Sequence, residues 1–337
     1  MDKTKAKKIT IVDVAAKAGV SKTTISRYLN GKFEYMSEKS RERIGEVIKE
    51  LGYRPNNLAR SLKSQQSRLL GVIVSDITSP FSPILLKGIS DCCERYRYRM
   101  LIANSDDDPA KEREYILSML DQQVDGIILN TAGKNSDFLL EMSQESVPIV
   151  LADRPLEVKL FDTVRTADRA IIYDVLQYLK ETGYDSVGFV VESLANNTRI
   201  RRCNAFREAY EAIFQETSSV YLLAGNLEDS DQVLRRFMLE HEGHKRAILA
   251  ANGVVTLRMV QAMQRLGIHF PEDVGICGFD DWEWMSLING GLTAVQQPTY
   301  DVGKECVTLM MQRLHRNHNA LPKTLELPCK LVVRGST

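Results

Sequence analysis

Short apolar segments alternate with longer amphipathic segments through most of this 337-residue chain, and this alternation constrains its fold more than any other feature. The apolar runs have the length and composition of buried strands and lie at 69–76, 100–106, 124–130, 147–153, 185–192, 247–252 and 273–281. The stretches 81–97 and 109–121 have helical patterns. Alternating strands and helices predict parallel sheets with helices on both faces. Strands that are apolar throughout are typical of such doubly covered sheets.

Two sheets fit this pattern better than one. The first set of strands ends near 153, and the stretch 154–168 leads into a second set from about 169. Near 296 the segment QQPTYDVGKE interrupts the pattern, which allows the chain to cross back to the first sheet. We therefore predict an α/β body of two doubly wound subdomains over 68–337. The first comprises 68–166 and 298–337, and the second comprises 167–297.

The segment DVAAKAGVSKTTISRYLNGK near the amino terminus has a different pattern. Apolar residues recur at helical spacing over 11–18, Gly19 suits the positive φ of a tight turn, and Ser21 is a good N-cap for a second helix. A third helix over 37–51 completes a small core. This pattern predicts an all-α helix-turn-helix domain over 1–54, whose second helix enters the DNA major groove. A small three-helix bundle without a DNA-binding role is the alternative interpretation.

Charge is unevenly distributed, although the chain holds 44 basic and 44 acidic residues. Residues 1–68 hold 16 Lys and Arg against 7 Asp and Glu, a net charge of +9, and the remainder holds 28 against 37, a net charge of −9. A basic head suggests a polyanionic partner. The segment 55–67 has residues that suit a helix start and a short apolar face, but it is too short to be stable as an isolated helix. We predict a linker helix that folds only when something stabilises it.

Other classes of protein are disfavoured by what the sequence lacks. The six cysteines include no C-x-x-C pair, and the five histidines lack an H-E-x-x-H signature, so we expect no disulfide framework, metal or cofactor. No nucleophile elbow or phosphate-binding glycine loop is present, so we expect no enzymatic activity. The amino terminus lacks an apolar secretory segment, and no run of 18 apolar residues follows. We expect a cytoplasmic protein with no membrane partner rather than an exported solute-binding protein.

Several segments, taken in order, resemble a known family. They are ITIVDVAAKAGVSKTTISRYLNG, IKELGYRPNNLARSLKS, GVIVSDITSPF, VDGIIL, VPIVLADRP, PEDVGICGFDD and LTAVQQPTYDVG. Together they resemble the lac/gal repressor family of bacterial regulators over about residues 9–334. The resemblance implies a homodimeric repressor that binds a pseudo-palindromic operator. It also implies a body similar to the periplasmic sugar-binding fold.

The resemblance further implies which residues contact DNA. Lys22, Thr23 and Arg27 match the base-contacting positions of the family, and Lys and Arg side chains can donate to guanine O6 and N7. The positions that match phosphate contacts are Ser21, Asn30 and Tyr53. The linker matches the hinge helix of the family, which inserts a leucine wedge into the minor groove. Its matching residues are Asn56, Ala59, Leu62 and Lys63, with Leu62 as the wedge.

The body of this family binds an effector between its subdomains, and ligands of such sheets bind beyond the carboxyl ends of the strands. The predicted effector residues lie at strand ends and in the loops that follow: Asp76, Ser79, Phe81, Asn130, Asp153, Arg154, Asp168, Arg169, Thr198, Arg202, Asn252 and Asp280. Arg202 and Asp280 match the family positions that usually hold ligand hydroxyls.

Two departures from the family pattern bear on the ligand. Asp168-Arg169 stands where Asp-Asn is common, and Asn252-Gly253 stands where Asn-Asp is common. The loop 195–202 carries three arginines, and arginine can hold a carboxylate by two parallel hydrogen bonds. These cations favour a sugar-acid inducer, such as gluconate or 2-keto-3-deoxygluconate, and hence a repressor of a sugar-acid catabolic operon. The alternative within the family is a global or corepressor-dependent regulator that responds to a partner protein or a different ligand.

Overall fold

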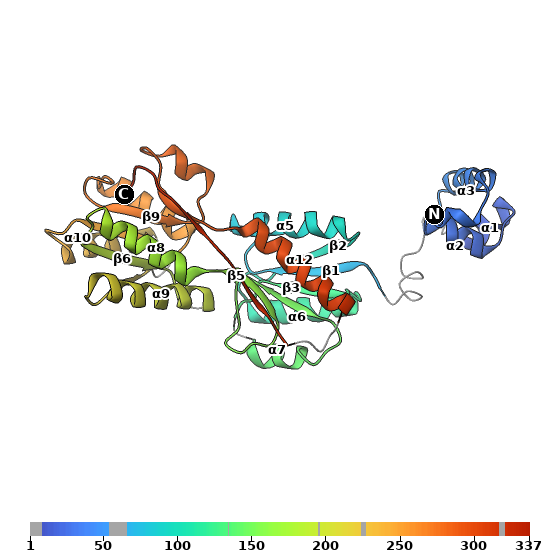
Figure 1. Cartoon of the computed structure of the whole chain (residues 1–337), viewed down its shortest axis with the longest axis horizontal. Coiled ribbons are helices and arrows are strands. Elements are labelled where there is room, and N and C mark those ends of the chain that lie inside the picture. The colour runs from blue at the N-terminus through green and yellow to red at the C-terminus, as the bar shows by residue number, and fades with distance from the viewer. Residues whose placement is uncertain (1–8, 54–65, 134, 195, 224–226, 317–320) are drawn as a thin grey trace, which may run out of the picture. The chain divides into compact units, whose positions relative to one another are not determined.

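The computed structural model describes residues 9–53, 66–133, 135–194, 196–223, 227–316 and 321–337. Its internal contacts divide the chain into an N-terminal unit, Met1–Ser67, and a body, Arg68–Thr337. The N-terminal unit is helical, and the body holds two sheets with helices around each of them (Figure 1). The predicted fold class, an all-α head followed by two α/β subdomains, is confirmed.

The N-terminal unit contains α1 (Ile11–Ala18), α2 (Lys22–Leu29), the 3-10 helix η1 (Phe33–Tyr35) and α3 (Glu38–Glu50). Gly19, with φ of 68°, ends α1 in the left-handed region, as a tight turn between helices requires. Ser21 caps α2, because its Oγ accepts the backbone N–H of Thr24 at 3.1 Å. The core of the unit consists of Val14, Ala15, Ala18, Ile25, Ile44 and Val47. The predicted helix-turn-helix is therefore confirmed.

The first sheet of the body has the strand order β11-β5-β4-β3-β1-β2 and is parallel throughout. Its strands are β1 (Leu69–Val74), β2 (Arg99–Asn104), β3 (Gly126–Leu129), β4 (Ile149–Ala152), β5 (Asp162–Thr166) and β11 (Thr324–Leu327). Helices α5 (Phe81–Arg95) and α12 (Thr299–Arg316) share one buried cluster with the sheet. Helices α6 (Pro109–Asp121) and α7 (Ser136–Met142) share another. Both faces are therefore covered.

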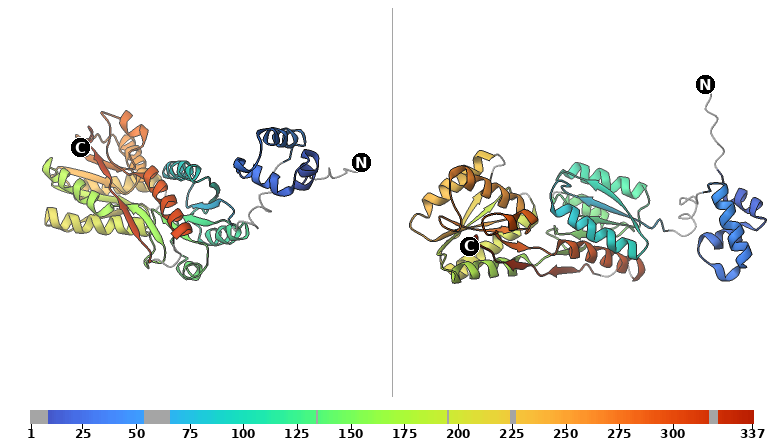
Figure 2. Two further views of the ribbon diagram at one scale, coloured as in Figure 1. Left: turned by 45° about the vertical axis from the view of Figure 1, so that its right-hand side comes forward. Right: turned by 90° about the horizontal axis from the view of Figure 1, so that it is seen from above.

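The second sheet has the strand order β12-β10-β9-β8-β6-β7. Its strands are β6 (Ser186–Val191), β7 (Ser219–Leu222), β8 (Arg246–Ala250), β9 (Gly275–Phe279), β10 (Thr293–Gln296) and β12 (Lys330–Val332). Helices α8 (Asp168–Glu181) and α9 (Asn197–Phe214) pack with one buried cluster. Helices α10 (Leu227–Glu240) and α11 (Gly253–Leu266) pack with the other, beside the 3-10 helix η2 (Glu283–Leu287). Figure 2 shows the two sheets as separate lobes of the body.

The chain passes between the two sheets three times: after β5, after β10 and after β11. The last passage corrects the predicted assignment of all of 298–337 to the first subdomain. Strand β12 pairs antiparallel with β10 of the second sheet. The tail beyond it stays there, because Ser336 Oγ donates to the carbonyl of Ile276 at 2.6 Å and accepts the N–H of Thr293 at 2.8 Å. These contacts join segments far apart in the sequence, so no local pattern indicates them.

Two glycines allow α5 and α12 to pack closely. A Cβ atom on Gly88 would lie 2.0 Å from the carbonyl oxygen of Tyr300, and one on Gly303 would lie 2.4 Å from that of Leu85. Both obstacles are backbone atoms of the facing helix, which cannot rotate away as a side chain does. The two helices that cover one face of the first sheet are therefore in direct backbone contact with each other.

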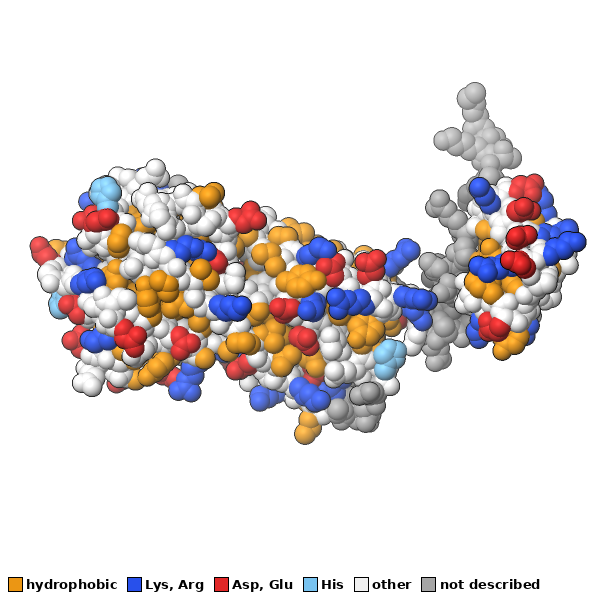
Figure 3. Space-filling model, turned by 45° about the horizontal axis from the view of Figure 1, so that its top comes forward, with side chains coloured by type: hydrophobic (Ala, Val, Ile, Leu, Met, Phe, Trp, Pro, Cys, Tyr) orange, Lys and Arg blue, Asp and Glu red, His pale blue; other side chains and the backbone are white. Residues whose placement is uncertain are grey.

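The surface of the body carries charges of both signs. Figure 3 shows Lys and Arg side chains interspersed with Asp and Glu on one face of the body, with hydrophobic side chains between them. Charged side chains of the body also pair between elements, as Arg165 does with Glu326 and Arg265 with Asp231, both at 2.5 Å. Exposed pairs of this kind contribute at most about 1 kcal/mol each. The buried clusters, rather than these pairs, therefore hold the body together.

Candidate functional site

The exposed face of α2 carries the predicted base-contacting residues. The side chains of Lys22, Thr23 and Arg27 are exposed, whereas Ile25 on the same helix is fully buried in the core of the unit. The guanidinium of Arg27 lies 4.9 Å from the ring centroid of Tyr35. A short helix with cationic and hydroxyl groups on its free face has the donors that major-groove contacts require.

The other predicted DNA contacts differ in their surroundings. Ser21 is exposed and caps α2, while the Asn30 amide donates to the carbonyl of Ser26 at 2.8 Å and thus stabilises the end of α2. Tyr53 packs partly buried against the core, and burial raises the pKa of its hydroxyl. The predicted hinge contacts lie outside the described residues: Asn56, Ala59, Leu62 and Lys63.

The body contains a cavity of about 480 Å³ at the carboxyl ends of strands from both sheets. The residues directly after β3, β4, β9 and β10 line it, as the position of ligands in such sheets predicts. Of the predicted effector residues, those that line the cavity are Asp76, Ser79, Phe81, Asn130, Asp153, Arg154, Thr198, Arg202, Asn252 and Asp280. A hollow of about 600 Å³ at 269–273, Asn289 and Gly335 adjoins the amino end of β9, where ligands of such sheets are not expected.

Arg202, on α9, is almost completely buried and held by three elements. Its guanidinium donates to Asp168 Oδ1 at 3.0 Å, to the carbonyl of Ala251 at 2.8 Å and to Gln297 Oε1 at 2.7 Å. It also lies over the ring of Phe279, 4.1 Å from the centroid. Asp168 does not line the cavity. It lies behind Arg202 and orients the guanidinium of that residue.

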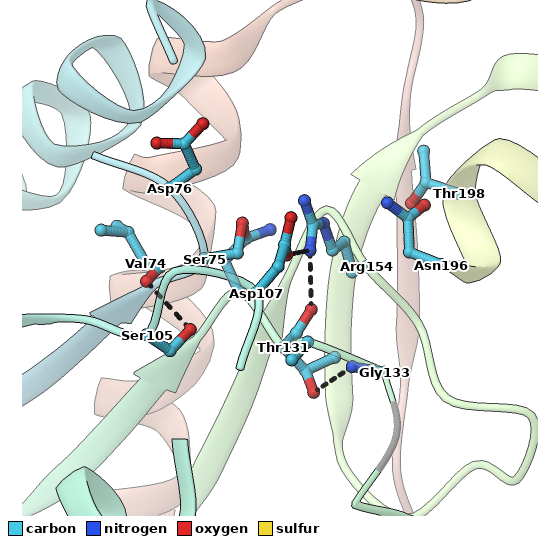
Figure 4. A network of polar contacts seen from close by, with 12 residues as sticks. Val74, Ser75, Asp76, Ser105, Asp107, Thr131, Gly133, Arg154, Asn196 and Thr198 are labelled. Atoms are coloured by element: carbon cyan, nitrogen blue, oxygen red, sulfur yellow. Dashed lines mark hydrogen bonds and ion pairs between the residues drawn. The ribbon is translucent and has the colours of Figure 1, made fainter. Parts of the chain in front are cut away.

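Arg154 occupies the wall formed by the first subdomain. Its guanidinium donates to Asp107 Oδ1 and to the carbonyl of Thr131, the latter at 3.1 Å. Figure 4 shows Arg154 held between these two residues and facing Asn196 and Thr198 of the second subdomain. Thr198 in turn donates from its hydroxyl to the carbonyl of Asp153 at 3.3 Å, which joins the two walls of the cavity.

The carboxylates of the cavity differ in their environments. Asp153 has a φ of 65°, and burial raises the pKa of its carboxyl to about 6, although Arg202 and Arg154 act in the opposite direction. Asp280 has a φ of 81° and accepts the backbone N–H of Gly253 at 2.7 Å and the side-chain amide of Gln297. The orientation of its carboxylate is thus fixed by these two protein donors.

Arg169 lies outside the cavity, in contrast to the prediction. Its side chain is 83% exposed and forms an ion pair with Glu208 at 3.1 Å. The residue follows Asp168 in α8, and consecutive residues of a helix point about 100° apart. Since Asp168 faces the interior, Arg169 is directed toward solvent.

Several cavity residues were not predicted from the sequence. They are Ser75, Glu192, Asn196, Arg199, Arg258, Trp282 and Gln297, with their neighbours. Glu192 comes directly after β6, as Asn130 does after β3. Its place in the cavity could therefore have been predicted from its position at the end of a strand. Arg258 lies in the second turn of α11 and Gln297 follows a strand that was not predicted, so only the fold indicates them.

Comparisons with known proteins agree with this architecture. The family model described as bacterial regulatory proteins of the lacI family matches residues 10–56, and the periplasmic binding protein-like domain matches 176–337. The HTH-type transcriptional regulator KdgR of Bacillus subtilis is 38% identical, over 97% of this chain and 97% of the relative. The chain belongs to the lacI family of bacterial regulatory proteins. It is therefore a DNA-binding transcriptional regulator.

Further relatives support the same assignment across the whole length of this lacI-family regulator. The HTH-type transcriptional regulator PtxS of Pseudomonas putida is 34% identical, over 98% of this chain and 96% of the relative. A crystal structure of the lac repressor dimer bound to operator and the anti-inducer ONPF shares the fold, with a TM-score of 0.85 at 22% identity over 98% of this chain and 99% of that one. No helix among the described residues is long and apolar enough to cross a membrane.

Proposed function

We propose that this regulator represses a carbohydrate catabolic operon and that a sugar acid entering the cavity of the body releases it from its operator. The observation that carries the proposal is the cavity itself, because its walls come from the strand ends of both subdomains. A ligand there contacts both lobes at once, so its affinity depends on how closely they approach. A ligand that binds one arrangement more tightly shifts the population toward it.

The lining suits a polyhydroxylated molecule. Asp280 and Asn252 offer acceptor oxygens to ligand hydroxyls, and the side chain of Asn252 donates to Glu192 Oε2 at 3.3 Å, which limits its rotation. Phe81 and Trp282 add aromatic surface that can cover the C–H faces of a sugar. Four arginines line the same cavity beside five carboxylates, so the support for a negatively charged sugar comes from the grouping of the cations and not from the net charge of the lining.

The regulator acts on DNA as a homodimer in this proposal, with one α2 in each half of a pseudo-palindromic operator. Arg27 and Lys22 contact bases, and Leu62 is the minor-groove wedge. Replacing Arg27 by Ala should weaken operator binding by about 1–3 kcal/mol, as expected for a residue that contacts a base. Arg43→Ala is the matched control, because it removes the same charge from an exposed position on α3.

Fluorescence anisotropy of a labelled duplex from the upstream region of the regulated operon tests the proposal. The full-length protein is bound to the duplex and titrated with gluconate, 2-ketogluconate, 2-keto-3-deoxygluconate and the neutral sugars glucose, galactose and ribose. Release by an acid and not by the neutral sugars supports the proposal. Release by a neutral sugar alone contradicts the acidic ligand, and a stable complex in all titrations favours regulation by a partner protein or a corepressor.

A further inference from the structure

The four arginines that line the cavity are not equivalent. Arg202 donates from Nε to Asp168, from Nη1 to Ala251 and from Nη2 to Gln297, whereas Arg154 donates from Nη1 to both Asp107 and Thr131. All three nitrogens of Arg202 are therefore engaged, and the charge of Arg154 is balanced by the carboxylate of Asp107. A cation without a carboxylate of its own has to lie elsewhere in the cavity.

The remaining pair, Arg199 and Arg258, shares a single protein carboxylate. Arg199, in the first turn of α9, reaches Glu192 Oε2 with its Nη2 at 2.7 Å, and its Nη1 donates long hydrogen bonds of 3.4 Å to the carbonyl and the Oγ of Ser193. Arg258, on α11, lies with its Nη1 3.5 Å from Glu192 Oε1, which is an ion pair at longer than usual hydrogen-bond distance. Among the described residues, Glu192 is the only charged partner of Arg258. Two cations thus face one anion, and the group carries a net charge of +1.

The group is partly shielded from solvent yet open to the cavity. The exposed fractions of the side chains are 22% for Arg199, 27% for Arg258 and 16% for Glu192, and all three line the cavity. Partial burial strengthens the attraction of an incoming anion, because water screens the charges less. The guanidinium donors of Arg258 match the geometry of a carboxylate, which accepts two parallel hydrogen bonds from one guanidinium.

A nearby glycine bears on the shape of this wall. Gly253 comes one residue after Asn252, where the resemblance to the family implies an aspartate. A Cβ atom on Gly253 would lie 2.6 Å from the ring of Trp282, so the indole ring fills the space that a side chain at 253 would need. At position 253 this wall therefore presents an indole ring, and the carboxylate nearest to it is that of Asp280, which accepts the Gly253 N–H at 2.7 Å.

We propose that Arg199 and Arg258 form the subsite for the carboxylate of the effector, with Glu192 as the residue that positions both guanidinium groups. This assignment rests on the proposed function and names the cavity wall that distinguishes an acid from a neutral sugar. The ligand carboxylate supplies the second negative charge of the group, and the hydroxyls of the ligand extend toward Asp280. The selectivity for an acid resides in Arg199 of α9 and Arg258 of α11, and not in Arg154 or Arg202.

Binding of three matched pairs of ligands, each an acid and its amide, to the full-length protein tests the subsite. The probes are gluconate and gluconamide, 2-ketogluconate and its amide, and 2-keto-3-deoxygluconate and its amide, because each pair differs mainly in charge. Calorimetry gives the ratio of acid affinity to amide affinity. In Arg258→Gln and in Arg199→Gln this ratio should fall by about tenfold, the effect of losing one charge-assisted contact. Arg258→Lys, which keeps the charge, should retain part of the selectivity.

Two further variants make the result specific. Glu192→Gln removes the charge that competes with the ligand carboxylate and keeps a side-chain oxygen that can accept from the guanidinium groups, so the ratio should not fall as it does in the arginine variants. Arg265→Gln is the control, because Arg265 lies on the same helix, pairs with Asp231 at 2.5 Å and does not line the cavity. It should leave the ratio unchanged. Thermal unfolding of each variant shows whether a lost affinity reflects a lost fold.

The outcomes separate the subsite from the function on which it rests. If the wild-type protein binds none of the acids, the proposed sugar-acid effector is wrong, and the subsite with it. If the wild-type protein prefers the acid and both arginine variants keep that preference, the sugar-acid effector stands and the subsite is refuted. If Arg265→Gln loses selectivity as much as Arg258→Gln, removing a positive charge anywhere on the helix has the same consequence. The subsite is then also refuted.

Discussion

Replacing Asp153 by Asn should stabilise the body of the regulator at neutral pH. Burial raises the pKa of Asp153 from 3.8 to about 6, so the folded protein resists its ionisation. A difference of that size corresponds to about 3 kcal/mol at pH 7, since each unit is worth about 1.4 kcal/mol. The figure is an upper bound, because the side chain is partly exposed. Asn tolerates the positive φ of 65° at this position, so the substitution adds no backbone strain.

The raised pKa of Asp153 also predicts how the stability difference between variant and wild type changes with pH. Between about pH 4 and pH 6 the folded state binds more protons at Asp153 than the unfolded state does, so the stability of the wild-type protein falls as the pH rises through this window. The side-chain amide of the variant does not titrate. The advantage of the variant should therefore be full above pH 7, smaller at pH 5, about a fifth of its full size at pH 4 and absent below about pH 3.

Calorimetric unfolding of the wild-type protein and the variant at pH 7.5, 5 and 4 measures the effect. A rise in Tm of roughly 5 °C at pH 7.5 is expected for a body of this size. Asp106→Asn is the control, because Asp106 also has a positive φ but is exposed, and the hydrogen bond from Lys111 lowers its pKa. That variant should gain no stability. An equal Tm for Asp153→Asn and wild type at pH 7.5, or an advantage at pH 4 as large as that at pH 7.5, would refute the reasoning.

Other substitutions probe the packing and the DNA-binding face. Gly88→Ala should destabilise the body by about 1–3 kcal/mol in urea unfolding, since its Cβ meets the backbone of Tyr300; an unchanged midpoint would contradict the close contact. Gly253→Ala should displace the Trp282 ring and shift tryptophan emission; identical spectra would show that the ring does not occupy that space. Operator affinity should fall steeply with salt concentration, and Lys22→Ala should reduce that slope only if Lys22 contacts a phosphate rather than a base.

The sequence predicted the strands that form uninterrupted apolar runs, including β2, which lies at the edge of its sheet and is largely exposed. Strands β1, β3, β6 and β8 consist almost entirely of buried residues, and their apolar runs are unmistakable. The unpredicted strands include β7, β11 and β12, in which exposed and partly buried residues predominate. Such strands lie at or near the edges of the sheets, where pairing depends on partners that are distant in the sequence.

The candidate site divides in the same way. Asn130, Asp153 and Asp280 were predictable because each follows a buried strand, and the ends of parallel strands meet at one edge of a sheet. Arg258 was not predictable, since a helical position faces a cavity only when the packing of its helix is known. Arg169 was misplaced for the same reason, because its direction from α8 depends on which side of that helix is buried.

The three passages between the sheets restrict how the lobes of the body can move. Each is short: Thr166 to Asp168, Gln296 to Thr299, and Leu327 to Lys330. They lie side by side, because β11 pairs with β5 in one sheet and β12 pairs with β10 in the other. Three short connecting segments that lie side by side resist sliding and twisting of one lobe against the other. Bending about these segments is then the easiest relative motion of the two lobes. An effector bound in the cavity as proposed would act through a single angle between the lobes. Chemically different ligands that stabilise the same angle would then have the same effect on operator binding.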